Sequence, residues 1–170
     1  GGLLAAAGEN VTLITRDEAH VTAITHRGLR IVDATDGGRT DPDDPENHTR
    51  RVSVPATTDP ASVGTVDLVI VFTKSDATAD AMADAAPLLG PTTVVLTLQN
   101  GLGNADVIAE HVPEQRVLVG VTTHGALREA PGCVRHTGDG DTTLGWWCEQ
   151  TAADGDGDAA GSDASAGDCA

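Results

Sequence analysis

Residues 68–74 read LVIVFTK and residues 96–103 read LTLQNGLG, and these two stretches decide the fold. Each begins as a largely apolar run, which is typical of a strand buried within a parallel sheet. The first run stops at Lys74, the only lysine of the chain, and the second stops at Gln99 and Asn100. Because ligands of open parallel sheets bind outside the carboxyl ends of the strands, we expect Lys74 and Asn100 to border a site for an anionic, hydrogen-bonding ligand.

Strand and helix patterns alternate on both sides of these two stretches. The pattern predicts strands at 11–15, 29–32, 51–54, 68–72, 94–98 and 117–121, and helices at 1–8, 17–27, 76–89 and 105–111. The pair Gly90-Pro91 is expected to close the third helix, and the strands at 133–136 and 142–144 are expected to leave the main sheet. The alternation predicts an α/β fold with a doubly wound, Rossmann-like and mostly parallel sheet.

The composition limits both the core and the partners. Aromatic residues are only 2% of the 170 residues, so Val, Leu, Ile and Ala must form the core. A net charge of −16 argues against nucleic acid or an anionic membrane as the main partner. One lysine against 26 acidic residues is typical of a protein from a high-salt cytoplasm, although an ordinary acidic protein is the alternative.

Several other classes of protein find no support in the sequence. The three cysteines have no paired spacing, and most of the histidines are scattered without zinc-ligand spacing, so neither a disulfide framework nor a metal site is predicted. There is no Gly-x-Ser-x-Gly motif, no signal peptide and no apolar run of membrane length. We therefore expect a cytoplasmic protein by default.

The chain divides into two parts by composition. Residues 1–150 carry the strand and helix patterns, and the segment 33–49 within them is predicted to be a solvated loop. Residues 151–170 consist mainly of Ala, Gly, Asp and Ser, without bulky apolar side chains. Such a segment cannot bury enough surface to offset the entropy of ordering, so we predict a disordered acidic tail or linker.

Several motifs together resemble one enzyme family. They are GGLLAAAGENVTLITR at 1–16, VFTKS at 71–75, QNGLGN at 99–104, GVTTHGA at 120–126 and PGCVRHTGDGDTTLG at 131–145. In order and spacing they resemble the ketopantoate reductases, which are NADPH-dependent 2-dehydropantoate 2-reductases. The resemblance extends from about residue 1 to residue 145, and each motif alone is weak.

The sequence departs from this family at both ends. Family members begin with a strand and a G-x-G-x-x-G turn that binds pyrophosphate, whereas this chain begins inside the following helix. The family also has a C-terminal helical domain that supplies the catalytic lysine and most substrate contacts. The resemblance therefore implies a partial NADP-binding domain at 1–150 that contains no catalytic residue and is inactive on its own.

The resemblance assigns cofactor contacts to four residues. Arg16 matches a family arginine that binds the 2′-phosphate of NADP, although it could instead pair with Asp17 or Glu18 at the surface. Lys74 matches a lysine at the cofactor edge of the sheet, where a solvated strand-end lysine is the alternative. Ala126 matches a position whose main chain meets the cofactor, and a small residue in a tight loop is an equal alternative.

Asn100 matches an asparagine that contacts both the nicotinamide ribose and the substrate. Its amide can donate and accept at once, and Gly101 and Gly103 permit close backbone approach. The alternative is an ordinary turn residue that caps the next helix. His124 is expected to be structural, and Trp146 and Trp147 are expected to pack where the second domain begins.

The function implied is the reduction of 2-dehydropantoate, a small 2-oxo acid, by NADPH on the way to pantothenate and coenzyme A. The resemblance also allows a homodimer of the full-length protein. A second hypothesis is another NAD(P)-dependent dehydrogenase of 2-oxo or 3-hydroxy acids, because the missing domain shapes the substrate pocket. A third is a non-enzymatic acidic interaction module, which would have no affinity for NADPH.

Overall fold

The structure is a computed structural model that describes residues 1–33 and 49–148. The predicted solvated loop, for residues 34–48, and the predicted disordered tail at 151–170 lie outside the described residues.

A parallel sheet forms one half of the molecule, as predicted. Strands β5 (Val66–Val71), β6 (Leu89–Thr97) and β7 (Val117–Thr122) run parallel to one another, and β10 (Thr142–Trp146) pairs antiparallel with β7. The prediction that residues 142–144 leave the main sheet is therefore wrong. Gly120 of β7 lies opposite Leu144, and a Cβ at this glycine would overlap the Leu144 side chain. The missing side chain lets β10 lie close against β7.

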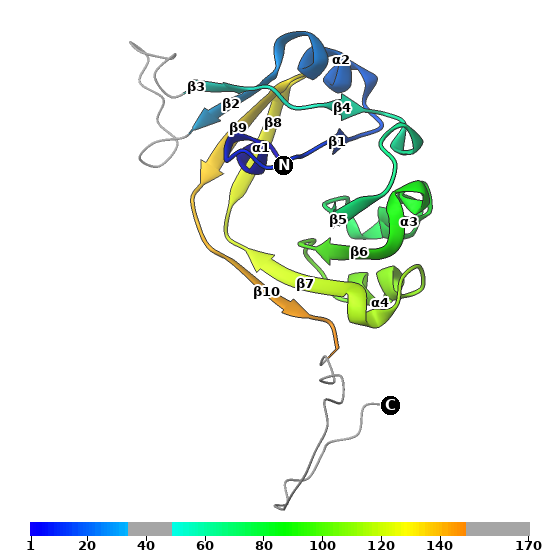
Figure 1. Cartoon of the computed structure of the whole chain (residues 1–170). Helices are drawn as coiled ribbons and strands as arrows, with labels where there is room; N and C mark the ends of the chain where they lie inside the picture. Colours follow the sequence, from blue (N-terminus) through cyan, green and yellow to red (C-terminus); the bar gives the residue numbers. More distant parts are fainter. Residues whose placement is uncertain (34–48, 149–170) are drawn as a thin grey trace, which may run out of the picture.

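Helices α3 (Thr78–Asp84) and α4 (Asn104–Ala109) cover the outer face of this sheet (Figure 1). The helix predicted at 76–89 is only Thr78–Asp84, with short 3-10 helices at Ser75–Ala77 and Ala86–Leu88 on either side. The expectation that Gly90-Pro91 closes it is wrong, because both residues belong to β6. The Thr93 hydroxyl accepts from the Gly90 amide at 2.8 Å and lies 2.6 Å from the Val66 carbonyl, which draws this segment onto β5. The buried core consists of Val71, Met82, Val95, Ala105, Ile108, Val112 and Val117.

A second, mixed sheet forms the other half, and Figure 1 shows two neighbouring connections, β7 to β8 and β9 to β10, between the halves. Its order is β3 (Thr49–Val52), β2 (Leu29–Asp33), β9 (Cys133–Gly138) and β8 (Gly125–Ala130). Strand β9 leaves the main sheet as predicted, whereas β8 was not predicted. Helix α2 (Glu18–Arg27) has its N-cap at Asp17. The core of this half consists of Ile24, Leu29, Ile31, Val52 and Val54.

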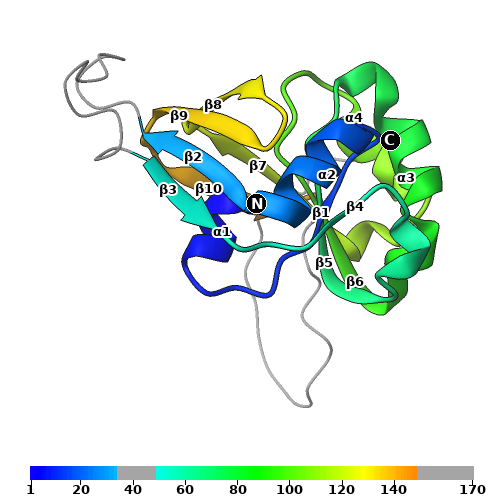
Figure 2. The same ribbon diagram turned by 90° about the horizontal axis from the view of Figure 1, so that it is seen from above.

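Helix α1 (Gly2–Ala6) is followed by the short strand β1 (Leu13–Ile14), which pairs in parallel with β4 (Ala56–Thr57). Helix α2 lies beside β4 (Figure 2). Four strand pairings are parallel, namely β1–β4, β2–β9, β5–β6 and β6–β7. Strand β5 is an edge strand, and no strand within residues 1–33 and 49–148 pairs with its outer side. The fold is thus Rossmann-like and mostly parallel. The resemblance implies that the first strand of the family is absent, and none of the described strands takes its place.

Candidate functional site

The loops that carry Lys74 and Asn100 are hydrogen-bonded to each other at the carboxyl edge of the parallel sheet. Lys74 follows β5 and Asn100 follows β6, so parallel pairing brings both loops to the same edge. The Ser75 hydroxyl donates to the Asn100 carbonyl at 2.7 Å. The Gln99 side-chain amide donates to the Thr73 carbonyl at 2.8 Å. The expectation that these two strand ends form one edge is borne out.

Three neutral side chains hold the two loops together, and we call Gln99, Thr78 and Asn104 the amide network. The Gln99 amide nitrogen lies 2.9 Å from the Thr78 hydroxyl, which in turn lies 3.1 Å from Asn104 Oδ1. The Asn104 amide nitrogen donates to the carbonyls of Asn100 and Gly101, both at 3.3 Å. Thr78 and Asn104 are buried, so water cannot replace these bonds easily.

The sequence placed Gln99 among the polar residues at the predicted binding edge, but it assigned no role to Thr78 or Asn104. Asn104 stands at the end of the QNGLGN motif and begins α4, so its polar character at the start of a helix was a usable signal. Thr78 carried no such signal, because a threonine in a helix beginning usually acts locally. Its hydroxyl contacts the Ser75 carbonyl locally, and its partners Gln99 and Asn104 lie 21 and 26 residues away in sequence, so only the fold brings these three side chains together.

The side chain of Asn100 is exposed, and it makes no hydrogen bond within the described part of the chain. It does not cap α4, because the N-cap is Gly103, with φ of 84°, and no side chain bonds the helix end. Gly101 has φ of 101°, a left-handed conformation that favours glycine. The loop therefore presents the Asn100 amide outward, with its own backbone fixed by the amide network.

Lys74 and Arg16 differ in their partners. Lys74 is exposed and has no ion-pair partner among residues 1–33 and 49–148. Arg16 follows β1 as expected, and its Nη2 lies 2.7 Å from Asp84 Oδ2 on α3, which raises the pKa of the guanidinium. The alternative partners considered for Arg16, Asp17 and Glu18, are not the ones observed.

Asp17 has a different task. Its carboxylate accepts from the His20 backbone amide at 3.0 Å and pairs with Arg128 at Nη1, joining α2 to β8. The His20 amide is the first cause, ahead of Arg128, that holds the pKa of Asp17 below its usual value. The Asp17 carboxylate therefore caps α2 and links it to β8, whereas Arg16 pairs with Asp84 on α3.

Ala126 lies in the mixed sheet, on β8, opposite His136 of β9. It is exposed and follows the end of β7, so all four candidate residues come after the carboxyl end of a parallel strand. Hydrogen bonds join the Lys74 loop to the Asn100 loop, and the Arg128–Asp17 pair joins the strand of Ala126 to the residue that follows Arg16. Trp146 and Trp147, expected to pack where the second domain begins, are 46% and 41% exposed.

An edge of this kind suits a dinucleotide. Unengaged donors at Lys74 and Asn100, left-handed glycines at 101 and 103 and an exposed Arg16 fit phosphate and ribose groups, which need cations and close backbone approach. None of the helices within the described ranges is long and apolar enough to cross a membrane.

Known proteins similar to this chain show its family. The model of the family described as ketopantoate reductase PanE/ApbA matches residues 1–148. The chain belongs to this family. The 2-dehydropantoate 2-reductase of Halobacterium salinarum is 47% identical over 148 residues, and that of Pyrococcus abyssi is 41% identical over 145 residues. These matches cover 85% of the chain but 44% and 42% of the relatives, so the chain spans less than half of their length.

Solved structures of related enzymes superpose on the chain. A PanE/ApbA family ketopantoate reductase from Ralstonia eutropha matches with a TM-score of 0.71 and 35% identity, over 85% of this chain and 44% of that one. A D-mandelate dehydrogenase, solved with NADH and anilino(oxo)acetate, matches with a TM-score of 0.70 and 29% identity, over 84% of this chain and 43% of that one. Ketopantoate reductases and a dehydrogenase solved with NADH thus share this fold.

Proposed function

We propose that this chain is the cofactor-binding part of an NADPH-dependent 2-dehydropantoate 2-reductase, which makes pantoate for pantothenate and coenzyme A. Residues 1–150 would form its partial NADP-binding domain. One observation carries the proposal: in a chain of this family, the Lys74 and Asn100 loops are tied together and present unengaged polar side chains at the carboxyl edge. The bound cofactor would supply a hydride to the ketone carbon of the 2-oxo acid.

Each candidate residue would contribute binding or orientation. Arg16 would bind the 2′-phosphate of NADP, and Lys74 would bind phosphate or ribose oxygens. Asn100 would hold the nicotinamide ribose and the 2-oxo acid, and the Ala126 main chain would meet the cofactor. The proton donor would come from outside this chain, so we expect no useful reductase activity from the 170 residues alone.

The engagement of Arg16 by Asp84 refines this assignment. Asp84 occupies Nη2 and Nε of the guanidinium, at 2.7 and 3.2 Å, and leaves Nη1 for a second acceptor. A 2′-phosphate would therefore share Arg16 with a carboxylate or displace it. Asp84→Asn should tighten NADPH more than NADH, whereas Arg16→Asp should weaken NADPH more than NADH.

Asn100→Ala tests the site as a whole. The experiment uses a longer protein that also contains the segments of the relatives that this chain does not cover. A hydrogen bond between uncharged groups that is left unmade in a desolvated site costs about 1–3 kcal/mol. A loss of about 1.4 kcal/mol lowers kcat/KM tenfold. We expect kcat/KM to fall about tenfold or more, with weaker binding of both NADPH and the oxo acid. Leu102→Ala, a neighbouring change at a fully exposed side chain, is the control. Unchanged kinetics in Asn100→Ala would remove this residue from the site and undermine the proposal.

A second candidate function is another NAD(P)-dependent reductase of 2-oxo acids. The structural match to a D-mandelate dehydrogenase solved with NADH and anilino(oxo)acetate favours it, because this fold also serves other oxo acids and NADH. Comparing 2-dehydropantoate with aromatic 2-oxo acids, and NADPH with NADH, would separate the two candidates.

The acidic composition of the chain adds a proposal about its cellular surroundings. A net charge of −16 supports a protein adapted to a high-salt cytoplasm without a nucleic-acid partner, and a homodimer of the full-length protein stays a prediction. Self-repulsion is screened by salt, since the Debye length falls to about 3 Å at 1 M. Stability should therefore rise with KCl concentration, and a flat profile would contradict the salt adaptation.

A further inference from the structure

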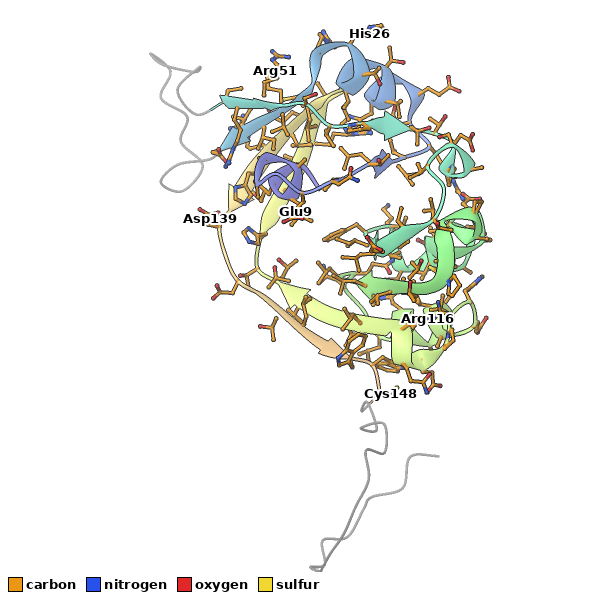
Figure 3. All side chains as sticks on the ribbon, in the orientation of Figure 1. Glu9, His26, Arg51, Arg116, Asp139 and Cys148 are labelled. Atoms are coloured by element: carbon orange, nitrogen blue, oxygen red, sulfur yellow. The ribbon has the colours of Figure 1, made fainter. Side chains whose placement is uncertain are left out.

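Two histidine rings and a carboxylate meet where the two connections between the sheets lie side by side. His124 lies between β7 and β8, His136 near the end of β9, and Asp139 just after β9 (Figure 3 labels Asp139). The distance from His124 Nδ1 to His136 Nε2 is 3.2 Å, and Asp139 Oδ1 lies 3.6 Å from the same Nε2. All three donor atoms lie within 4.8 Å of one another. We call these residues the histidine corner.

Asp33 fixes the orientation of the buried ring. His136 is 8% exposed, and its Nδ1 lies 3.2 Å from Asp33 Oδ1. Arg50 holds both oxygens of that carboxylate, each at 3.0 Å, which keeps Asp33 ionised and able only to accept. Nδ1 of His136 therefore donates to Asp33, and Nε2 faces His124 and Asp139. Metal-binding histidines commonly have a carboxylate in this position.

Backbone and threonine hydrogen bonds that involve none of these three side chains also hold the two connections together. The Thr123 amide donates to the Asp141 carbonyl at 3.0 Å, and the Asp141 amide donates to the Thr123 hydroxyl at 3.0 Å. The hydroxyls of Thr122 and Thr142 lie 2.9 Å apart. A Cβ at Gly140 would overlap the Thr123 hydroxyl, so the contact depends on this glycine. The histidine corner is thus preorganised.

We propose that the histidine corner binds one divalent transition-metal ion of the zinc type through His124 Nδ1, His136 Nε2 and Asp139 Oδ1. Two ligands at about 2.0–2.1 Å from a tetrahedral ion lie about 3.3 Å apart, close to the nitrogen separation observed. Imidazole with carboxylate suits Zn²⁺, Ni²⁺ or Cu²⁺ better than Mg²⁺ or Ca²⁺. Solvent has access beside Asp139, whose side chain is 93% exposed, and water would complete the coordination. The proposal does not depend on the reductase function.

The test is a Zn²⁺ titration of the 170-residue chain by calorimetry in about 1 M KCl, which screens loose binding to the acidic surface. We expect one ion per chain, with affinity at least tenfold lower in His124→Ala and in Asp139→Asn. Both side chains are exposed, so neither variant should disturb the fold, whereas the buried His136 could. His26→Ala, which removes an exposed histidine of α2 (Figure 3), is the matched control and should leave the affinity unchanged.

Cobalt distinguishes this site from the cysteines. Co²⁺ bound by nitrogen and oxygen should show no thiolate charge-transfer band, and its d–d bands should disappear in His124→Ala. Equal Zn²⁺ affinity in all variants, a thiolate band, or no binding tighter than that of Mg²⁺ would overturn the proposal. The two histidines would then be only a hydrogen-bonded pair that joins the two connections.

Discussion

The two halves of the molecule hold their loops by different means. At the edge of the parallel sheet, the amide network uses neutral side chains that bond to one another and to the backbone. The mixed sheet uses charges instead, through Arg50–Asp33, Arg135–Glu129, Arg128–Asp17 and the bonds of His136. Among the described residues, the only ion pair outside the mixed sheet and its connections is Arg16–Asp84.

Because of this difference, the two halves should respond differently to pH, salt and metal ions. The bonds of this edge join uncharged groups, so the edge should keep its geometry over a wide range of pH, which suits a ligand-positioning site. Ion pairs and histidines respond to protons, salt and metal ions, because each changes the charge of a partner. The parallel sheet should thus depend mainly on packing, and the mixed sheet on packing together with protonation.

The largest effect is expected from Ile108→Ala in the core of the parallel sheet. Ile108 is fully buried on α4, directly after the amide network, so the change leaves a cavity. The free energy of unfolding should fall by about 2–5 kcal/mol. Denaturant unfolding measures it, and Leu102→Ala, at a fully exposed leucine of the preceding loop, should cost less than about 0.5 kcal/mol. Equal losses would show that packing does not dominate this half.

An intermediate effect is expected from Asp17→Ala, which removes both the cap of α2 and its link to β8. Loss of an N-cap costs about 1 kcal/mol of unfolding free energy. Asp17→Asn keeps the capping oxygen but loses the ion pair with Arg128, so it should cost much less. Thermal melts of the two variants would separate the contributions. If Asp17→Asn were as damaging as Asp17→Ala, the ion pair and not the cap would hold α2.

The smallest effect concerns the pH dependence of stability through His20. Burial, followed by the charge of Arg128, lowers the pKa of His20 from 6.5, and its Nδ1 accepts from the Gly132 amide at 2.9 Å. Below pH 6.5 the unfolded chain therefore binds more protons at this residue, so the folded state should lose stability as pH falls from 7.5 to 5.5.

His20→Gln should reduce this loss, and unfolding curves at the two pH values measure it. His26→Gln, a change at an exposed histidine of the same helix, serves as the control and should keep the slope of the unchanged protein. An identical slope in His20→Gln would show that protonation of His20 does not contribute, and that the mixed sheet is less sensitive to pH than its charges indicate.

Sequence alone determined the three parallel strands of this half. The apolar runs predicted β5, β6 and β7, but the burial expected from them is uneven, since Val95 and Val117 are fully buried whereas Leu68 and Val121 are 45% and 73% exposed. Because parallel strands end at one edge, the placement of Lys74 beside Asn100 followed from the positions where the runs stop. The motifs also sufficed for the family, since their order is a property of the sequence itself.

Only the tertiary structure decided the rest. Strand β10 pairs with β7 because the chain reverses through the mixed sheet and returns against Gly120, and no local pattern specifies that return. Arg16 meets Asp84 across 68 residues, and His124 meets His136 across 12 residues and two strands. Side chains that meet between separate strands depend on strand register and on the connections, which are set by packing of the whole domain and not by neighbours in the sequence.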